Sequence, residues 1–164
     1  MQYLIQLIRG EISINIMGTN LSDFKTPSLA DPNLMINRVG KFNFDSHTFS
    51  LPKKRLNSFI SWNFNNYSLS LNSRYLDGYY NERTITGLGL TYGYENQVKS
   101  FLVHDISFGK NIDTTRGNLN LNLYLSNMFN KYAPRLYDAP DFSFDTRLHD
   151  PRGRILGLNI EYNF

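Results

Sequence analysis

The sequence contains no cysteine, which excludes disulfide bonds and thiolate metal sites. It also has no apolar run that approaches the ~20 residues needed by a membrane-spanning helix. In the best candidate, MQYLIQLIRGEISINIMG at the start, Arg9 and Glu11 interrupt the apolar pattern. This segment has neither a basic start nor a small-residue cleavage site, so it does not resemble a signal peptide. We expect Met1 to be an internal methionine of a longer reading frame.

Charge of one sign is not in large excess. The 17 basic and 14 acidic residues give a net charge of +3, and the basic residues are spread along the chain. Nucleic-acid-binding domains usually carry a clustered basic face, so no nucleic-acid partner is expected. Tryptophan occurs only once, but 12 Phe and 11 Tyr bring the aromatic content to 15%. Both of these residue types favour β-strands.

Apolar and polar residues alternate over much of the chain, which is the pattern of a β-strand with two different faces. The clearest run is residues 118–126, NLNLNLYLS, in which leucine occupies every second position. A helix would distribute these leucines around its circumference, whereas a strand places them all on one face. The last ten residues, 155–164, repeat the pattern up to Phe164.

About seven strands are expected in total, which predicts an all-β fold built as an antiparallel meander. The other predicted strands cover residues 2–8, 11–18, 56–64, 67–75 and 102–108. Asn65-Asn66 lies between two of them and predicts a hairpin, because asparagine tolerates the positive φ of a tight turn.

The predicted connections alternate between short and long. They cover 9–10, 65–66 and 109–117 (short), and 20–52, 78–100 and 127–151 (long). Soluble domains rarely contain several structureless connections longer than ~15 residues. Outer-membrane barrels, in contrast, have short turns at one rim and long loops at the other. We therefore predict that the long connections lie at one end of the sheet, and that the short ones and the C-terminus lie at the other.

The predicted apolar faces are aliphatic in the middle and aromatic near the strand ends, as at Trp62, Phe64, Tyr67 and Tyr75. This arrangement is typical of the aromatic girdles at the two membrane interfaces. The opposite faces are rich in Asn and Ser, as expected for a water-filled lumen. A transmembrane β-barrel is therefore favoured over a soluble sheet.

Two segments resemble the last strands of TonB-dependent receptors. LNLYLSNMFNKYAPRLYDAP is similar to the family's penultimate strand and the loop after it, with signature residues Asn127, Phe129, Asn130 and Lys131. HDPRGRILGLNIEYNF is similar to the final strand, with signature residues Asp150, Pro151, Arg152, Gly153 and Arg154. Residues 51–80 also resemble a hairpin of the family, so the resemblance covers residues 51–164 well and the first 50 loosely.

This resemblance implies that residues 1–164 are the C-terminal part of an outer-membrane receptor barrel. Family members also carry a plug domain and a TonB box, for which the sequence has no room, so contact with the TonB complex would require a missing N-terminal part. The whole receptor would import a scarce solute such as a siderophore, a vitamin or a glycan. The expected partners are outer-membrane lipid, lipopolysaccharide and the barrel assembly machinery. No cofactor and no enzymatic activity are expected.

Within this resemblance, the end of the chain implies an assembly signal. Leu158, Ile160, Tyr162 and Phe164 place apolar side chains at every second position up to the terminus. In the family, this alternation and the terminal aromatic residue are recognised by the barrel assembly machinery. An amphipathic edge strand is suited to such recognition because it can be templated by β-augmentation. An ordinary final strand that ends in Phe is the alternative.

Other polar groups have weaker functional interpretations. The acidic residues Asp138, Asp141, Asp145 and Asp150 could hold calcium, but their spacing matches no EF-hand, and a solvated loop is preferred. The basic run Lys53, Lys54 and Arg55 could meet lipopolysaccharide phosphates, although a solvated run is the simpler interpretation. His104 and Asp105 are adjacent, so a strand points them to opposite faces and they cannot form a catalytic pair.

Two rival functions remain open at this point. A small self-contained outer-membrane barrel would need an even number of strands, usually at least eight, and a leader peptide. A secreted soluble β-sandwich that binds carbohydrate would use the apolar faces as its core and exposed aromatic residues to bind sugar.

Overall fold

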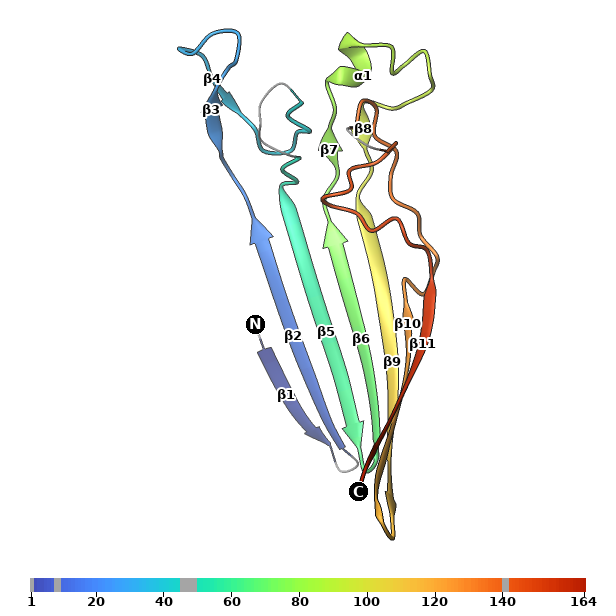
Figure 1. Ribbon diagram of the computed structural model, residues 1–164. Helices are drawn as coiled ribbons and strands as arrows, with labels where there is room; N and C mark the ends of the chain where they lie inside the picture. The colour runs from blue at the N-terminus through green and yellow to red at the C-terminus, as the bar shows by residue number, and fades with distance from the viewer. Residues whose placement is uncertain (1, 8–9, 45–49, 140–141) are drawn as a thin grey trace.

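The computed structural model describes residues 2–7 (backbone only), 10–44, 50–139 and 142–164. Its main feature is one antiparallel seven-stranded sheet in the order β1-β2-β5-β6-β9-β10-β11 (Figure 1). The strands are β1 (Gln2–Leu7), β2 (Gly10–Asn20), β5 (Lys54–Phe64), β6 (Tyr67–Leu76), β9 (Phe101–Thr114), β10 (Gly117–Ser126) and β11 (Ile155–Asn163). Each strand pairs with the next long strand along the chain. The predicted all-β antiparallel meander is therefore confirmed.

The hairpin at Asn65-Asn66 is also confirmed, and Asn65 has the expected positive φ of 49°. The bounds predicted for the short connection at 109–117 are wrong, because β9 continues through Thr114 and only residues 115–116 separate it from β10. The reason lies in the pairing. Lys110 lies opposite Leu121 and Ile112 opposite Leu119, so β10 holds this polar stretch in an extended conformation. The turn between β1 and β2 falls on residues 8–9, outside the described residues.

The sequence suggested that the long connections are structureless, but two of them contain short elements. The first contains a small hairpin of β3 (Lys25–Pro27) and β4 (Met35–Asn37). The second contains another, of β7 (Tyr79–Tyr80) and β8 (Gln97–Val98), with the short helix α1 (Arg83–Thr86) between them. These elements have only two to four residues each, too few to show a periodic pattern in the sequence.

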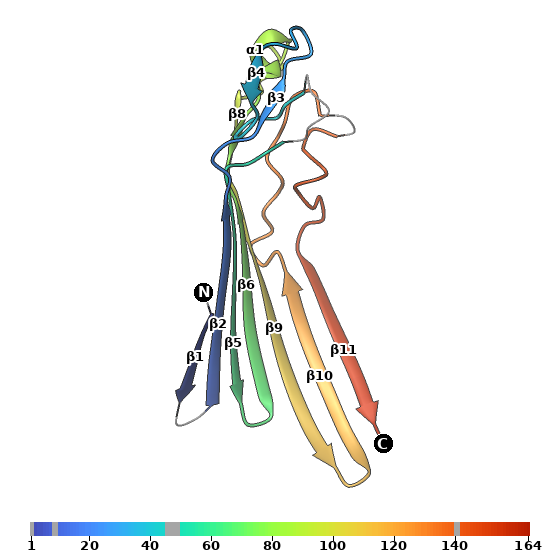
Figure 2. The same ribbon diagram turned by 90° about the vertical axis from the view of Figure 1, so that its left-hand side faces the viewer.

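The predicted placement of the connections is confirmed (Figures 1 and 2). The three long connections lie together at one end of the sheet, here called the loop end. The tight turn at 65–66, the turn at 115–116 and the C-terminus lie at the opposite end, here called the turn end. The antiparallel register requires this alternation, because successive strands reverse direction.

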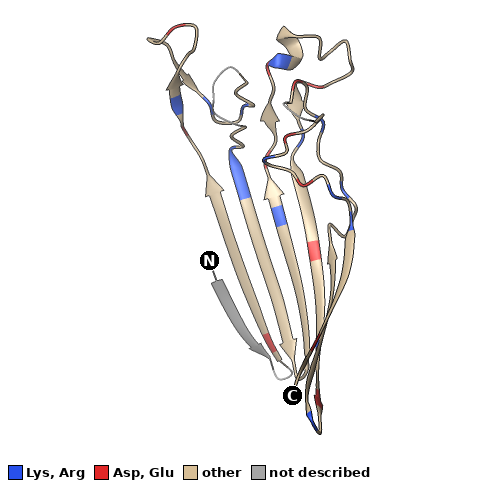
Figure 3. Ribbon diagram, viewed as in Figure 1, with Lys and Arg blue, Asp and Glu red and all other residues tan. Residues whose placement is uncertain are grey.

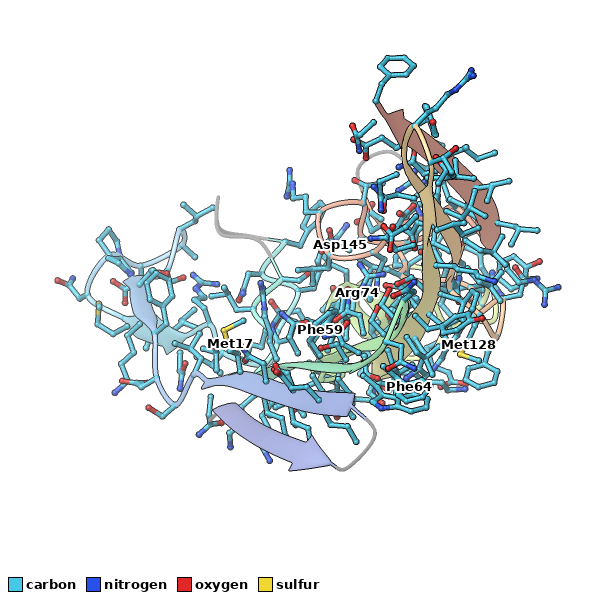
Figure 4. The ribbon with its side chains drawn as sticks, turned by 90° about the horizontal axis from the view of Figure 1, so that it is seen from below. Met17, Phe59, Phe64, Arg74, Met128 and Asp145 are labelled. Carbon is cyan, nitrogen blue, oxygen red and sulfur yellow. The ribbon has the colours of Figure 1, made fainter. Side chains whose placement is uncertain are left out.

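The sheet is bent into an open arc, visible from its turn end in Figure 4. Met17, Phe59, Arg74 and Asp145 lie on the inner side of this arc, the concave face, whereas Phe64 lies on the outer side, the convex face. Within the described residues β1 pairs only with β2, and β11 only with β10, so the sheet has two open edges and does not close into a barrel.

Candidate functional site

The strand register aligns apolar side chains in continuous rows across the convex face. Residues paired across an antiparallel sheet point to the same side, so each row can be followed from strand to strand. The central row consists of Ile14, Ile60, Leu71, Ile106, Leu125 and Leu156. The next row towards the turn end consists of Ile12, Trp62, Leu69, Phe108, Leu123 and Leu158. Together they form one uninterrupted apolar surface.

Charged side chains are confined to the ends of the convex face. Among its described residues only Lys54 at the loop end and Lys110 near the turn end carry charge. Lys110 places its Nζ 5.1 Å from the centre of the Tyr67 ring. Figure 3 shows that the middle of the strands is otherwise almost free of charge; the exceptions, Arg74 and Asp105, belong to the concave face.

No described element covers this apolar surface. Leu158 and Ile160 on β11 are 60% and 61% exposed, and Trp62 is also exposed. Soluble monomers rarely expose contiguous apolar patches of more than a few hundred Å². The other two sheets have two strands each and lie at the loop end (Figure 1), so neither serves as the second layer of a sandwich.

The height of the apolar band can be worked out along β9. Leu102 and Ile112 are the outermost apolar residues of the convex face on this strand, ten residues apart, and the band between them includes one polar row of Ser58, Ser73 and His104. At about 3.3 Å per residue this is about 33 Å along the strand. A strand tilted by about 40° would span about 25 Å along the membrane normal, which is the height of the apolar band of outer-membrane barrels.

The concave face is mainly polar, and several of its hydrogen bonds converge on the Asp105 carboxylate. Its Oδ1 accepts hydrogen bonds from Ser126 Oγ and from the Asn127 backbone N–H, both at 2.8 Å. Its Oδ2 accepts from Arg74 Nη2 at 3.0 Å and from Asn72 Nδ2 at 3.5 Å. These four bonds tie three strands and the start of the last loop to one carboxylate.

The first group of signature residues builds a tight turn after β10. Asn127 and Asn130 have positive φ values of 48° and 52°, which asparagine tolerates better than most residues. The Asn127 side chain accepts from the Lys131 N–H and donates to the Lys131 carbonyl, both at 2.8 Å. Phe129 stays 70% exposed and packs edge-on against His104.

The second group lies beside the first, where the chain enters β11. Asn130 Oδ1 accepts from the Arg154 N–H at 2.9 Å. A Cβ atom at Gly153 would lie 2.6 Å from the same oxygen, so the close approach favours glycine. The structure thus brings together two signature segments that are more than 20 residues apart in the sequence.

Asp150 and Arg152 form a bidentate pair across Pro151. Asp150 accepts from Arg152 Nε at 3.0 Å and from Nη2 at 2.7 Å, and also from the Arg152 backbone N–H at 3.0 Å. These hydrogen bonds lower the pKa of the Asp150 carboxyl to about 2. The pair is exposed, and Arg152 lines a cleft on the concave face.

The long connections pack against one another into a layer with its own core, here called the loop layer. Phe42, Tyr79, Val98 and Leu136 form this core. Ser50 donates a 2.5 Å hydrogen bond to Asp145 Oδ2, which joins the first and last loops. The sequence did not predict this core, because its members come from short elements far apart in the chain.

His149 anchors the last loop on the sheet. It is 4% exposed, and its ring meets the Phe101 ring edge-on at 4.9 Å. Neither ring nitrogen has a hydrogen-bond partner among the described residues. Burial lowers the pKa of His149 to about 4, against the opposing effect of the nearby Asp145 carboxylate.

The acidic residues of the last loop do not converge. Asp138 pairs with Arg83 at 2.8 Å, Asp145 accepts from Ser50, and Asp150 pairs with Arg152. Asp141 lies outside the described residues. In the part of the chain that the structure describes, no group of three or more His, Cys, Asp or Glu side chains could hold a metal ion.

The basic run at the start of β5 is divided between the two faces. Lys54 shares the side of Leu56 on the convex face, whereas Arg55 shares the side of Phe59 on the concave face. Of the two residues inside the strand, only Lys54 therefore points away from the concave face; Lys53 precedes the strand and is exposed. Adjacent residues of a strand point to opposite faces, so the sequence could have separated residue 55 from residue 54. The prediction instead treated the three basic residues as one group.

The assembly-signal residues lie on an open edge. Leu158, Ile160 and Tyr162 point to the convex side of β11, whose outer edge is unpaired within the described residues. Phe164 follows the last residue of the strand and is fully exposed at the turn end, with its ring 5.3 Å from the Tyr162 ring.

No protein-family model matches the chain, and no curated protein or solved structure is significantly similar to it. Within the described residues, no helix is long and apolar enough to cross a membrane.

Proposed function

We propose that this chain is the C-terminal wall of a TonB-dependent receptor in the bacterial outer membrane, which takes up a scarce solute. The observation that carries the membrane part of this proposal is the uncovered convex face, with its two continuous apolar rows, opposite a mainly polar concave face. Lipid tails would cover the first face and water the second. This division matches the lipid side and the lumen side of an outer-membrane barrel.

The distribution of charge supports the same placement. Lys110 stacks on Tyr67 and can extend its ammonium group towards an interface, as long basic side chains do near membrane boundaries. At the loop end, Lys53 and Lys54 are exposed where lipopolysaccharide phosphates would lie. The loop layer would then face the outside of the cell and the turn end the periplasm.

The two open edges require further strands in this setting. Unpaired backbone groups cost several kcal/mol each in hydrocarbon, so lipid-exposed sheet edges do not occur within the membrane. We infer that β1 and β11 pair with other strands of a larger barrel. The barrel assembly machinery would recognise β11 and Phe164 before this closure.

Solute uptake rests on the resemblance to TonB-dependent receptors. The contacts among the signature residues give that resemblance a physical meaning. Asn127 and Asn130 need positive φ, and Asn130 and Gly153 need close approach. The signature would thus preserve the geometry by which the last loop returns to the final strand.

The experiment that tests the membrane placement uses Trp62, the single tryptophan of the chain. The chain is refolded in detergent micelles that contain ordinary or brominated phospholipid, because its unpaired edges would exclude the isolated chain from a bilayer. Bromine quenches tryptophan only at short range. Because Trp62 is exposed on the convex face, we expect blue-shifted emission and strong quenching by the brominated lipid.

A matched variant moves the only tryptophan to the opposite face. Combining Trp62→Phe with Phe59→Trp places the indole on the concave face, on the same strand (Figure 4). This variant should respond to a water-soluble quencher and only weakly to brominated lipid. Equal lipid quenching of both proteins would contradict the proposal. So would a monodisperse, water-soluble monomer that unfolds cooperatively without detergent.

A further inference from the structure

The concave face carries a cleft of about 190 Å³ beneath the loop layer. Its floor is the loop end of β5, β6 and β9, and the segment that leads into β11 closes it from the other side. The floor supplies Arg55, Arg74 and Val103, and the closing segment supplies Leu148, Asp150 and Arg152. All of these residues belong to the described chain, so the cleft does not need another protein to be complete.

Three arginines line this cleft, and two carboxylates neutralise two of them. Arg74 pairs with Asp105 at 3.0 Å and Arg152 with Asp150 at 2.7 Å. The guanidinium group of Arg55 has no ion pair or side-chain hydrogen bond among the described residues. The local charge of the five groups is therefore 3 − 2 = +1. One positive charge is left for a ligand.

The wall next to the free guanidinium is apolar. Leu76 lies opposite Arg55 on the neighbouring strand, and Phe101 lies opposite Leu76 on the next. Phe101 and Val103 are buried, and Leu148, which packs against the loop-layer core, also lines the cleft. A ligand in contact with both the arginine and this wall needs a charged end and an apolar body.

We propose that this cleft binds a small organic monoanion, with its carboxylate on Arg55 and its apolar part against Phe101, Val103 and Leu148. Arginine binds carboxylates through two parallel hydrogen bonds, which gives orientation as well as affinity. Asn57, also in the cleft, supplies an additional amide donor. The inference goes beyond the proposed receptor function, because it depends only on contacts within this chain.

Benzoate is a suitable probe because it has both a carboxylate and an aromatic ring, and benzamide is its neutral counterpart. The full 164-residue chain is labelled with ¹⁵N and refolded in detergent. The amide signals of Arg74 and Val103 are then followed during titration with each probe. Benzoate should shift them saturably, with millimolar affinity as expected for so small a ligand. Benzamide should leave them nearly unchanged.

Two variants change the charge of the cleft in opposite directions. Arg55→Gln removes the free cation and should weaken benzoate binding about tenfold or more, because hydrogen bonds to charged groups are strong. Arg55→Lys keeps the charge and should retain part of the affinity. Asp150→Asn keeps an acceptor for the Arg152 backbone N–H but removes the negative charge that pairs with the Arg152 guanidinium. The cleft then gains positive charge, so benzoate should bind more tightly.

Arg116→Gln is the control, because it removes the same charge in the turn between β9 and β10, far from the cleft. It should leave benzoate binding unchanged. The proposal is overturned if wild-type protein shows no saturable benzoate shifts, if benzamide binds equally well, or if Arg55→Gln and Arg116→Gln have the same effect. Tryptophan quenching by brominated lipid is measured separately, so failure of the anion site and failure of the membrane placement are distinguishable.

Discussion

Arginine substitution at Ile60 tests whether the middle of the convex face lies in hydrocarbon. Ile60 belongs to the central apolar row, between Ile14 and Leu71. On β9 this row passes through Ile106, which is four residues from the loop-end limit of the band and six from the turn-end limit. The nearer limit is thus about 13 Å away along the strand, which is longer than an arginine side chain.

We therefore expect Ile60→Arg, in a complete barrel that contains this chain, to lower the free energy of unfolding in phospholipid vesicles by about 2–4 kcal/mol, the cost of arginine near the bilayer midplane. Leu121→Arg should cost only about 1 kcal/mol. Leu121 lies opposite Lys110, in a row that contains Tyr67 and lies near the boundary of the band. The register therefore places Leu121 closer to the turn end than Ile60.

The matched control is Ser61→Arg, one residue further along the same strand and on the concave face. Ser61 lies between Ser13 and Ser70, in a polar setting, so this substitution should change the unfolding free energy by less than about 0.5 kcal/mol. Stability is measured by reversible urea unfolding, followed by circular dichroism. Equal losses for the two substitutions would refute the assignment of one face to lipid and the other to water.

Three further predictions concern the loop layer and the turn end. Because the buried His149 has a pKa of about 4 and an exposed histidine one near 6.5, only the unfolded chain is protonated between these values. The free energy of opening the loop layer, measured by hydrogen exchange, should be constant above pH 7 and fall by roughly 3 kcal/mol between pH 6.5 and 4; His149→Phe should remove this dependence. Asn127→Ala should cost about 2–3 kcal/mol in urea unfolding, because it loses two side-chain hydrogen bonds at a positive φ; Asn127→Gly should cost less, and equal costs would argue against backbone strain. Deleting Phe164 from a complete barrel that contains this chain should lower the yield of folded protein in the outer membrane without changing the stability of the folded fraction, whereas Phe164→Tyr should preserve the yield.

The alternation of apolar and polar residues was sufficient to predict the strands and their order. It failed where the pattern is interrupted, as at Gly109, Lys110 and Asn111, because pairing with β10 rather than local pattern holds these residues in a strand. It also failed within the long loops. The core residues Tyr79 and Leu136 meet there although more than 50 residues separate them, and no local pattern encodes such a contact.

The sequence predicted some of the candidate sites better than others. The signature motif identified Asn127 and Asn130, but only the backbone geometry showed that positive φ values explain the asparagines. The basic run was identified as surface charge, and its division between two faces was missed. The cleft could not be predicted, because Arg55, Arg74 and Arg152 come together only through strand pairing and the return of the last loop.

The loop layer and the seven-stranded sheet are stabilised by different interactions. The loop layer contains a buried apolar core, so part of its stability comes from side-chain burial within the chain. The seven-stranded sheet has backbone hydrogen bonds, but its convex side chains remain exposed, and in water they would gain little of the free energy that normally stabilises a sheet. Covering this face with hydrocarbon would supply that stabilisation, and additional strands at β1 and β11 would satisfy the edges. On this reasoning the environment is part of what stabilises the strands, whereas the cleft and the loop layer depend on contacts that the chain makes with itself.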